Sequence, residues 1–355
     1  MGLFISILVL SFLIFFHELG HFLAARFFGV HVEVFSIGFG KKLYVKEYGD
    51  TQYALSAIPL GGYVRMKGQD DANPAHRSEE PDSYNTKPPY ARLIILFAGP
   101  FANLFLAFLL YFFVALVGSQ QLAPIIAEPE ATMVAAKAGL KANDEITHIN
   151  GKPMHSWSEV REYIKDSEGE LEFVILRANR ELVFHITPQI RESENIFGET
   201  ILRPMIGIRP NGETREVAYS LLDSLPKALS DTAESSKMII LSIQKLLSGI
   251  VPASEVGGIV SIMQITSKAS ESGIITLALF TALISVNLGI LNLLPIPALD
   301  GGHIIFTLYE MLARRAPSVK VLTNLTISGW VLLASLMILG LYNDLSRIAQ
   351  GGILP

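Results

Sequence analysis

Two histidines and a glutamate near the amino terminus have the spacing of a catalytic metal site. His17 and His21 lie four residues apart, and Glu18 directly follows the first of them. This spacing places both imidazoles on one face of a helix, where they can bind the same zinc ion. The glutamate beside the first ligand can then act as a general base on the attacking water. The pattern therefore predicts metal-assisted hydrolysis.

The surroundings of this motif strengthen the prediction. Residues 3–16 are apolar apart from Ser6 and Ser11, so the motif continues an apolar helix. A glutamate inside a membrane span costs about 2.5–3.5 kcal/mol on insertion scales and marks function by default. The alternative is a helix end whose polar groups face lipid headgroups.

A carboxylate that could complete the site lies in a second polar motif, far along the chain. Residues 292–303 read NLLPIPALDGGH. The two prolines cannot continue a regular helix, and the paired glycines allow a sharp turn. Broken backbone at membrane depth is tolerated only where protein or a water-filled cavity surrounds it. Asp300 is therefore a candidate third ligand, with the fourth zinc position open for water. The alternative is that Asp300 caps a helix.

His303 follows three residues after this carboxylate. We interpret it as a group that supports a ligand or caps a helix, because a fourth protein ligand would close the metal site and block catalysis.

Composition indicates a membrane protein. Half of the 355 residues are hydrophobic and the mean hydropathy is positive, which is unusual for a soluble protein of this size. There is no basic run and no basic helix with interleaved aromatics, so we expect membrane lipid and no nucleic acid as a partner. The chain has no cysteine, which excludes disulfides, thiolate zinc ligands and a cysteine nucleophile. We expect no soluble small-molecule cofactor.

Four apolar stretches are long enough to span a membrane: residues 1–28, 91–118, 273–296 and 321–342. The first lacks the basic region and the cleavage site of a signal peptide, so we interpret it as a retained span. The third contains Ser285, Asn287 and Asn292, and we expect it to be buried against the others.

Lysines and arginines predict the orientation of these spans. They concentrate between the first and second spans and recur between the third and fourth, whereas none precedes the first. The positive-inside rule therefore places the first and third connections in the cytoplasm and both termini outside. The long segment between the second and third spans is expected outside. Both metal-site motifs then lie near the cytoplasmic face.

The remaining segments divide into smaller parts. Residues 29–90 combine alternating, glycine-punctuated stretches, typical of antiparallel hairpins, with a polar loop at 68–90 that could be a gate or a plain connection. We interpret residues 213–272 as amphipathic, interfacial helices, residues 297–320 as the second motif with a cytoplasmic loop, and residues 343–355 as a tail.

Residues 119–212 are expected to form a separate domain. Within it, residues 135–151 read AAKAGLKANDEITHING and resemble the signature of PDZ domains. Asn143 stands where glycine is usual, and asparagine also tolerates positive φ. We expect a helix at 157–166 and strands at 171–177 and 182–187. Such a groove could bind a peptide terminus or act as a size filter.

Taken together, the two metal-site motifs resemble the site-two protease family of intramembrane zinc metalloproteases (peptidase family M50), and the RseP-type branch most closely. Further similar segments occur along the whole chain: FSIGFG at 35–40, IPLGGYV at 58–64, FAGPFAN at 97–103 and YNDLS at 342–346. Many RseP-type proteins carry two tandem PDZ domains, whereas this chain has room for one.

The resemblance implies a fold of four transmembrane α-helices, a cytoplasmic membrane-associated β-hairpin element and one extracytoplasmic α/β PDZ domain, in the bacterial inner membrane. It implies Zn²⁺ bound by His17, His21 and Asp300, with Glu18 activating the water. It also implies that substrate is contacted by Asn292 and by an edge strand of the β-element, for which the candidates are Gly38, Phe39 and Gly40.

The implied activity is regulated intramembrane proteolysis. The expected substrate is a transmembrane segment of a single-pass protein such as an anti-sigma factor, cut after a first protease has removed its outer domain, with signal-peptide remnants as a further substrate class. A rival reading is a non-catalytic membrane PDZ scaffold with a structural metal site, which a lost ligand would favour; no ligand is lost here. A transporter would predict an internal repeat, and we see none.

Overall fold

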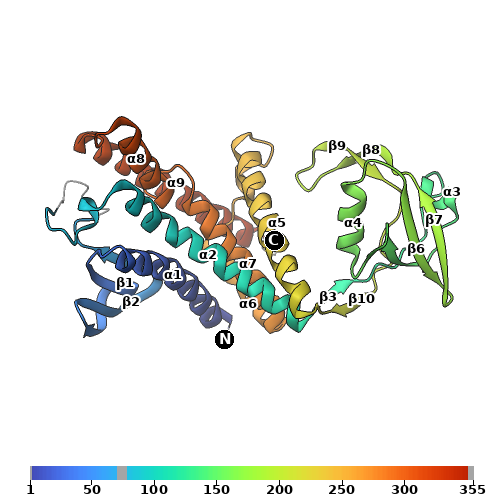
Figure 1. The fold of residues 1–355 in the computed structure, drawn as a ribbon, viewed down its shortest axis with the longest axis horizontal. Helices are drawn as coiled ribbons and strands as arrows, with labels where there is room; N and C mark the ends of the chain where they lie inside the picture. The colour runs from blue at the N-terminus through green and yellow to red at the C-terminus, as the bar shows by residue number, and fades with distance from the viewer. Residues whose placement is uncertain (1, 70–77, 351–355) are drawn as a thin grey trace. The chain divides into compact units, whose positions relative to one another are not determined.

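The computed structural model describes residues 2–69 and 78–350 and divides into two compact units (Figure 1). Unit 1 comprises Met1–Phe113 and Leu225–Pro355, and unit 2 comprises Val114–Ser224. Residues 70–77 of the expected polar loop and residues 351–355 of the expected tail lie outside the described residues.

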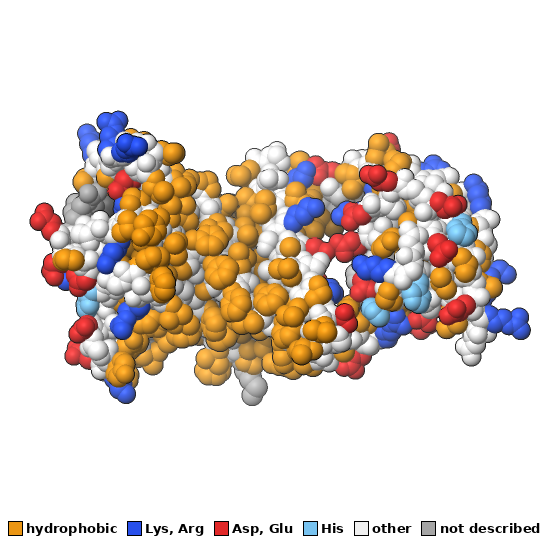
Figure 2. All heavy atoms as spheres, viewed as in Figure 1, with side chains coloured by type: hydrophobic (Ala, Val, Ile, Leu, Met, Phe, Trp, Pro, Cys, Tyr) orange, Lys and Arg blue, Asp and Glu red, His pale blue; other side chains and the backbone are white. Residues whose placement is uncertain are grey.

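Four helices in the described residues are long and apolar enough to cross a membrane: α1 (Gly2–Phe27), α2 (Pro89–Val117), α7 (Ile274–Asn292) and α9 (Val319–Ala349). Each of the four predicted spans therefore corresponds to one of these helices. Figure 2 shows hydrophobic side chains gathered over the helices of unit 1, whereas charged side chains are frequent on unit 2. The apolar window of α7 is 39% buried, against 17% for α1, in keeping with the polar residues of the third span.

Small residues let the membrane helices approach closely. A Cβ on Gly20 of α1 would lie 2.2 Å from the carbonyl oxygen of Ala98 on α2, and a Cβ on Gly289 of α7 would lie 3.1 Å from that of Pro100. Close backbone approach at small residues is the usual way in which membrane helices gain packing energy. Helix α2 therefore contacts both α1 and α7 through its Ala98–Pro100 segment.

Three further helices complete the helical part: α5 (Leu221–Leu247), α6 (Ile259–Glu271) and α8 (Asp300–Ala313), with short 3₁₀ turns η1 (Tyr84–Thr86) and η2 (Ala253–Glu255). Asp344 of α9 is fully buried. It accepts hydrogen bonds from the N–H groups of Gly258, Val260 and Ser261, at 3.0–3.1 Å. These N–H groups have no intrahelical partner at the start of α6, so the carboxylate fastens α6 to α9.

Two long strands form the hairpin of unit 1, β1 (Val32–Tyr48) and β2 (Thr51–Met66). They pair with an irregular register in which residues 34–37 of β1 have two sets of partners, residues 62–65 and residues 52–55. We expected several short hairpins here; the structure instead folds one long pair back on itself. Residues 62–66 thus form one edge of this small sheet.

Unit 2 combines short strands and helices: β3 (Ser119–Leu122), α3 (Val134–Ala138), β4 (Glu145–Ile149), β5 (Lys152–Pro153), α4 (Trp157–Lys165), β6 (Leu171–Arg177), β7 (Arg180–Ile186), β8 (Gln189–Glu194), β9 (Thr200–Met205) and β10 (Thr214–Val217). The four-stranded sheet has the order β5-β4-β6-β7. The expected helix and two strands are present, and Asn143 has the positive φ of 67° that its position required. Asp144 beside it is fully buried and paired with Arg177 at 2.6 Å.

Candidate metal centre

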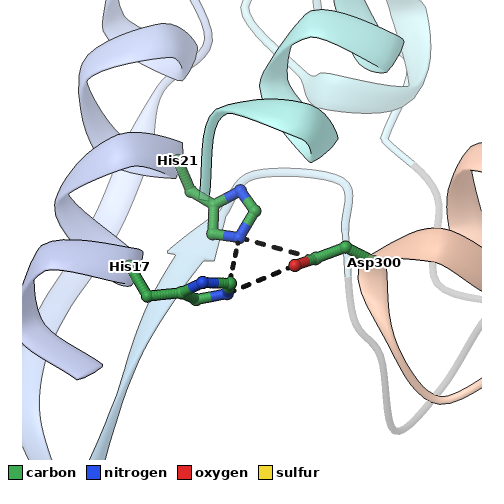
Figure 3. Close-up of side chains that lie close together, drawn as sticks. All are labelled: His17, His21 and Asp300. Carbon is green, nitrogen blue, oxygen red and sulfur yellow. Dashed lines mark hydrogen bonds and ion pairs between the residues drawn. The ribbon is translucent and has the colours of Figure 1, made fainter. Parts of the chain in front are cut away.

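Three side chains that are distant in sequence meet in unit 1 (Figure 3). His17 Nε2 lies 3.2 Å from Asp300 Oδ2, and His21 Nε2 lies 3.4 Å from Asp300 Oδ1. The two Nε2 atoms are 3.2 Å apart. Their side chains are at most 16% exposed. Lone-pair donors that face one another repel unless a proton or a cation lies between them, so this arrangement suits a bound cation.

Each ligand candidate is placed by local sequence. The two histidines project from one face of α1 because they are one helical turn apart. Asp300 is the first residue of α8. A Cβ on Gly301 would lie 2.2 Å from Leu294 O, and one on Gly302 would lie 2.4 Å from Ile296 O. Only glycine therefore allows the start of α8 to lie so tightly against the segment that follows α7.

His303 lies one turn further along α8, with its ring edge-on to that of Phe306 at 6.0 Å. The group of possible ligands found in the described residues consists of His17, His21 and Asp300. His303 is therefore not in that group, which agrees with the interpretation that it is not a fourth ligand.

Helix α2 contacts the Nδ1 atoms of both histidines. His21 Nδ1 lies 2.8 Å from the carbonyl oxygen of Ile95, and His17 Nδ1 lies 3.3 Å from the Asn103 amide nitrogen. A carbonyl can only accept, so Nδ1 of His21 carries the proton and its Nε2 keeps a free lone pair. Sequence reasoning missed both partners. Two sequence features could have indicated that this part of α2 is functional: an asparagine in an apolar span, and the Gly99-Pro100 pair.

The Gly99-Pro100 pair lies in the part of α2 that contacts His21. Pro100 has no N–H to donate within the helix, so the carbonyl of Leu96, four residues earlier, loses its usual donor. Gly99 leaves room for the imidazole: a Cβ there would lie 2.2 Å from His21 Nε2.

We expect Gly99→Ala to displace the His21 ring and to lower zinc affinity at least about 10-fold, the lower end of what disturbing a ligand's support costs. Alanine normally favours a helix by about 1 kcal/mol over glycine, so a loss would come from the clash. Bound zinc after dialysis, measured by inductively coupled plasma mass spectrometry, checks this. Gly169→Ala is the control, since nothing lies within 4 Å of its Cβ position. Full zinc retention by Gly99→Ala would contradict the described contact.

Glu18 is not in the group of three candidate ligands, and its carboxylate contacts the hairpin. Its Oε2 accepts a hydrogen bond from the N–H of Val64 on β2, at 3.1 Å. A Cβ on Gly62 would approach the Glu18 Cγ to 3.5 Å. The edge formed by residues 62–66 therefore runs beside Glu18, and a carboxylate held there can exchange protons with a group at the metal without being a ligand.

The predicted substrate-binding residues lie on separate elements. Asn292 ends α7 and is half-buried. Gly38 and Gly40 have positive φ values of 90° and 83°, which bend β1 on both sides of Phe39. The Phe39 ring stacks on that of Tyr63, with 6.3 Å between centroids. The strand in contact with Glu18 is β2. A substrate role for Asn292, Gly38, Phe39 and Gly40 stays a prediction.

The donor set fits zinc. Two imidazole nitrogens and one carboxylate oxygen are the protein ligands of many catalytic zinc sites and leave the fourth position open. Among the described residues, Asp300 Oδ2 is buried without a hydrogen bond and faces His17 Nε2 at 3.2 Å, which leaves it available to a metal ion. His21 is oriented by a carbonyl, as metal-binding histidines usually are.

Comparison with known proteins gives a consistent result. The family model described as "Peptidase family M50" matches residues 5–336. A Campylobacter jejuni protein described as "Putative zinc metalloprotease" is 47% identical over 343 residues, covering 97% of this chain and 93% of that protein. Proteins with the same description from Helicobacter pylori and Rickettsia conorii are 42% and 33% identical, over 97% and 96% of this chain and 99% and 98% of their own lengths.

Proposed function

Because the chain belongs to peptidase family M50 and is a multi-pass membrane zinc metalloprotease, we propose that it cleaves transmembrane segments of single-pass membrane proteins. The observation that carries the proposal is the meeting of His17 and His21, on a helix able to span a membrane, with Asp300 at the turn that follows another such helix. A site built there is positioned to act on peptide bonds at membrane depth.

The residues divide the work of peptide hydrolysis. His17, His21 and Asp300 would hold zinc, which supplies a Lewis acid for the scissile carbonyl and makes water more acidic. Glu18 takes a proton from the attacking water and passes it to the leaving amine. The N–H of Val64 donates to Oε2 of the Glu18 carboxylate, which helps to orient this group.

We propose that the substrate adds a strand beside Glu18. A helical segment keeps its peptide bonds internally hydrogen-bonded, so it must unwind before it can be cut. Residues 62–65 pair with β1 on one side, and the Val64 N–H reaches Glu18 on the other. An extended peptide can pair with such an edge through its main chain. Asn292 and the bend at Gly38-Phe39-Gly40 are the proposed further substrate contacts.

The proposed setting is the bacterial inner membrane, with both termini outside and the site near the cytoplasmic face. The distribution of lysine and arginine between the spans supports this orientation. The proposed physiological role is regulated intramembrane proteolysis of a protein such as an anti-sigma factor, after a first protease has trimmed its outer part. Signal-peptide remnants are a further substrate class.

We propose that unit 2 is a PDZ domain that controls access of substrates. Supporting features are its signature-like segment and a groove of about 380 Å³ between α4 and the chain around β9, lined by Trp157, Ile164, Arg203 and Met205 among others. Either a peptide terminus binds in this groove, or the domain excludes substrates with bulky outer parts. We favour exclusion.

Deletion of residues 125–210 should keep the chemistry and relax this control, because every proposed ligand lies outside that segment. The ladder between β3 and β10, with Ser119 opposite Val217, brings the cut ends together, so a short turn can close the gap. We expect the deleted enzyme to cut substrates with intact outer domains at rates near those of trimmed ones.

The test is a paired assay of full-length and trimmed substrate with wild-type and deleted enzyme. If the deleted enzyme still cuts only the trimmed form, the exclusion model is wrong. If it cuts neither while it remains folded and zinc-loaded, the domain delivers substrate instead.

A further inference from the structure

Asn103 is a fully buried amide within the apolar helix α2. Burying an amide in apolar surroundings costs free energy unless it is hydrogen-bonded. Its amide nitrogen lies 3.3 Å from His17 Nδ1, and its Oδ1 is buried without a hydrogen-bond partner. The side chain therefore meets the proposed metal centre, and its acceptor oxygen is unused.

We propose that Asn103 is a positioning residue for His17: its amide oxygen accepts the Nδ1 proton and so holds Nε2 deprotonated and aimed at the metal. The proposal rests on His17 being a zinc ligand. A neutral imidazole carries one proton, and a metal needs the lone pair of the other nitrogen. Since His17 Nε2 is the atom that faces His21 and Asp300, the proton belongs on Nδ1.

An amide can present either its oxygen or its nitrogen to the same neighbour, because the two exchange places when the group turns by 180°. With the nitrogen toward Nδ1, Nδ1 would have to accept and the proton would occupy Nε2, where it blocks metal binding. With Oδ1 toward Nδ1, the orphaned oxygen gains a donor and Nε2 is freed. The metal-loaded site thus selects the second orientation.

A further contact is made to the backbone of Asn103. Ser285 of α7 is also fully buried, and its hydroxyl donates to the backbone carbonyl of Asn103 at 2.7 Å. Polar contacts therefore connect α1, α2 and α7. The Asn103 side chain contacts His17, and the Asn103 backbone carbonyl contacts Ser285. Helix α2 supports both histidines in the same manner, with the Ile95 carbonyl on His21 and the Asn103 amide on His17.

The experiment compares zinc affinity, by competition with a chelator, for purified full-length wild type, Asn103→Leu and Asn103→Asp. Leucine has a similar size and no acceptor, so we expect a 10- to 100-fold loss of affinity, the range for partners of zinc-bound histidines. Aspartate keeps an acceptor and should retain affinity within about threefold. Raising free zinc should restore cleavage by Asn103→Leu, which a purely structural defect would not allow.

Asn324→Leu is the matched control: it makes the same change in α9 at an exposed position and should leave zinc affinity unaltered. If Asn103→Leu does not accumulate, Asn103→Ala removes the acceptor without that bulk and gives the same readout. Wild-type affinity in the acceptor-free variant, or an equal loss in Asn103→Asp, would overturn the proposal. His17→Ala separates the two hypotheses, because wild-type zinc affinity in that variant would mean that the ligand assignment itself has failed.

Discussion

Replacing Glu18 by glutamine abolishes peptide cleavage and leaves zinc bound, if Glu18 is the base. Loss of a general acid–base group typically costs 10²- to 10⁴-fold in rate. Glutamine can still accept the Val64 N–H bond seen for Glu18, so the change removes proton transfer with little effect on local structure. The measurement is the cleavage rate of a model transmembrane substrate in proteoliposomes, together with zinc content.

Glu271→Gln, at an exposed position on α6, serves as the control and should behave as wild type. Turnover near the wild-type rate in Glu18→Gln would rule out the base assignment. Loss of zinc from that variant would instead make Glu18 a ligand, contrary to its placement beside β2.

Asp300→Asn should lower zinc affinity and activity together. The substitution removes a negative charge and leaves a neutral amide, a poorer zinc ligand. We expect a loss greater than about 100-fold, the upper end of the cost for groups that only support a ligand. Chelator competition and cleavage rate measure the two effects, with the exposed Asp166→Asn as the control. Unchanged zinc content after dialysis would leave Asp300 as a helix cap only.

The sequence was most informative where geometry is local. His17 and His21 share a helix face by spacing alone, and the Pro295–Gly302 segment marks a break that brings one carboxylate forward. The Ile95 carbonyl and the Asn103 amide could not be assigned this way, because their roles depend on how α2 packs against α1. That packing depends in turn on Gly20 and Gly99. The sequence shows that these positions are glycine, but it does not show which atoms lie against them.

Hydropathy was a weaker guide to where helices end. We placed the end of the fourth span at residue 342, whereas α9 continues to Ala349. The buried Asn343 and Asp344 hydrogen-bond to residues 253–261, so protein contacts replace the water that those polar groups would otherwise need. Likewise α5 continues through Pro226, its sixth residue, where the proline removes one intrahelical hydrogen bond.

In the β-element, too, the sequence predicted the strands but not how they pack. Alternation predicted strands over residues 30–65, and β1 and β2 cover most of that range. The fold-back that gives residues 34–37 partners on two sides depends on glycine bends and irregular register, and the pattern of residue types did not indicate which edge would reach Glu18. The structure supplies that edge through Val64.

Locating the cleaved bond tests most directly whether the enzyme cuts within a transmembrane segment and uses Glu18 as the base. A single-pass substrate reconstituted in proteoliposomes with zinc-loaded enzyme would be analysed by mass spectrometry of its products. We expect a cut within the apolar segment, made by wild type and absent with Glu18→Gln. A cut confined to residues outside that segment, or the same products from Glu18→Gln, would contradict it.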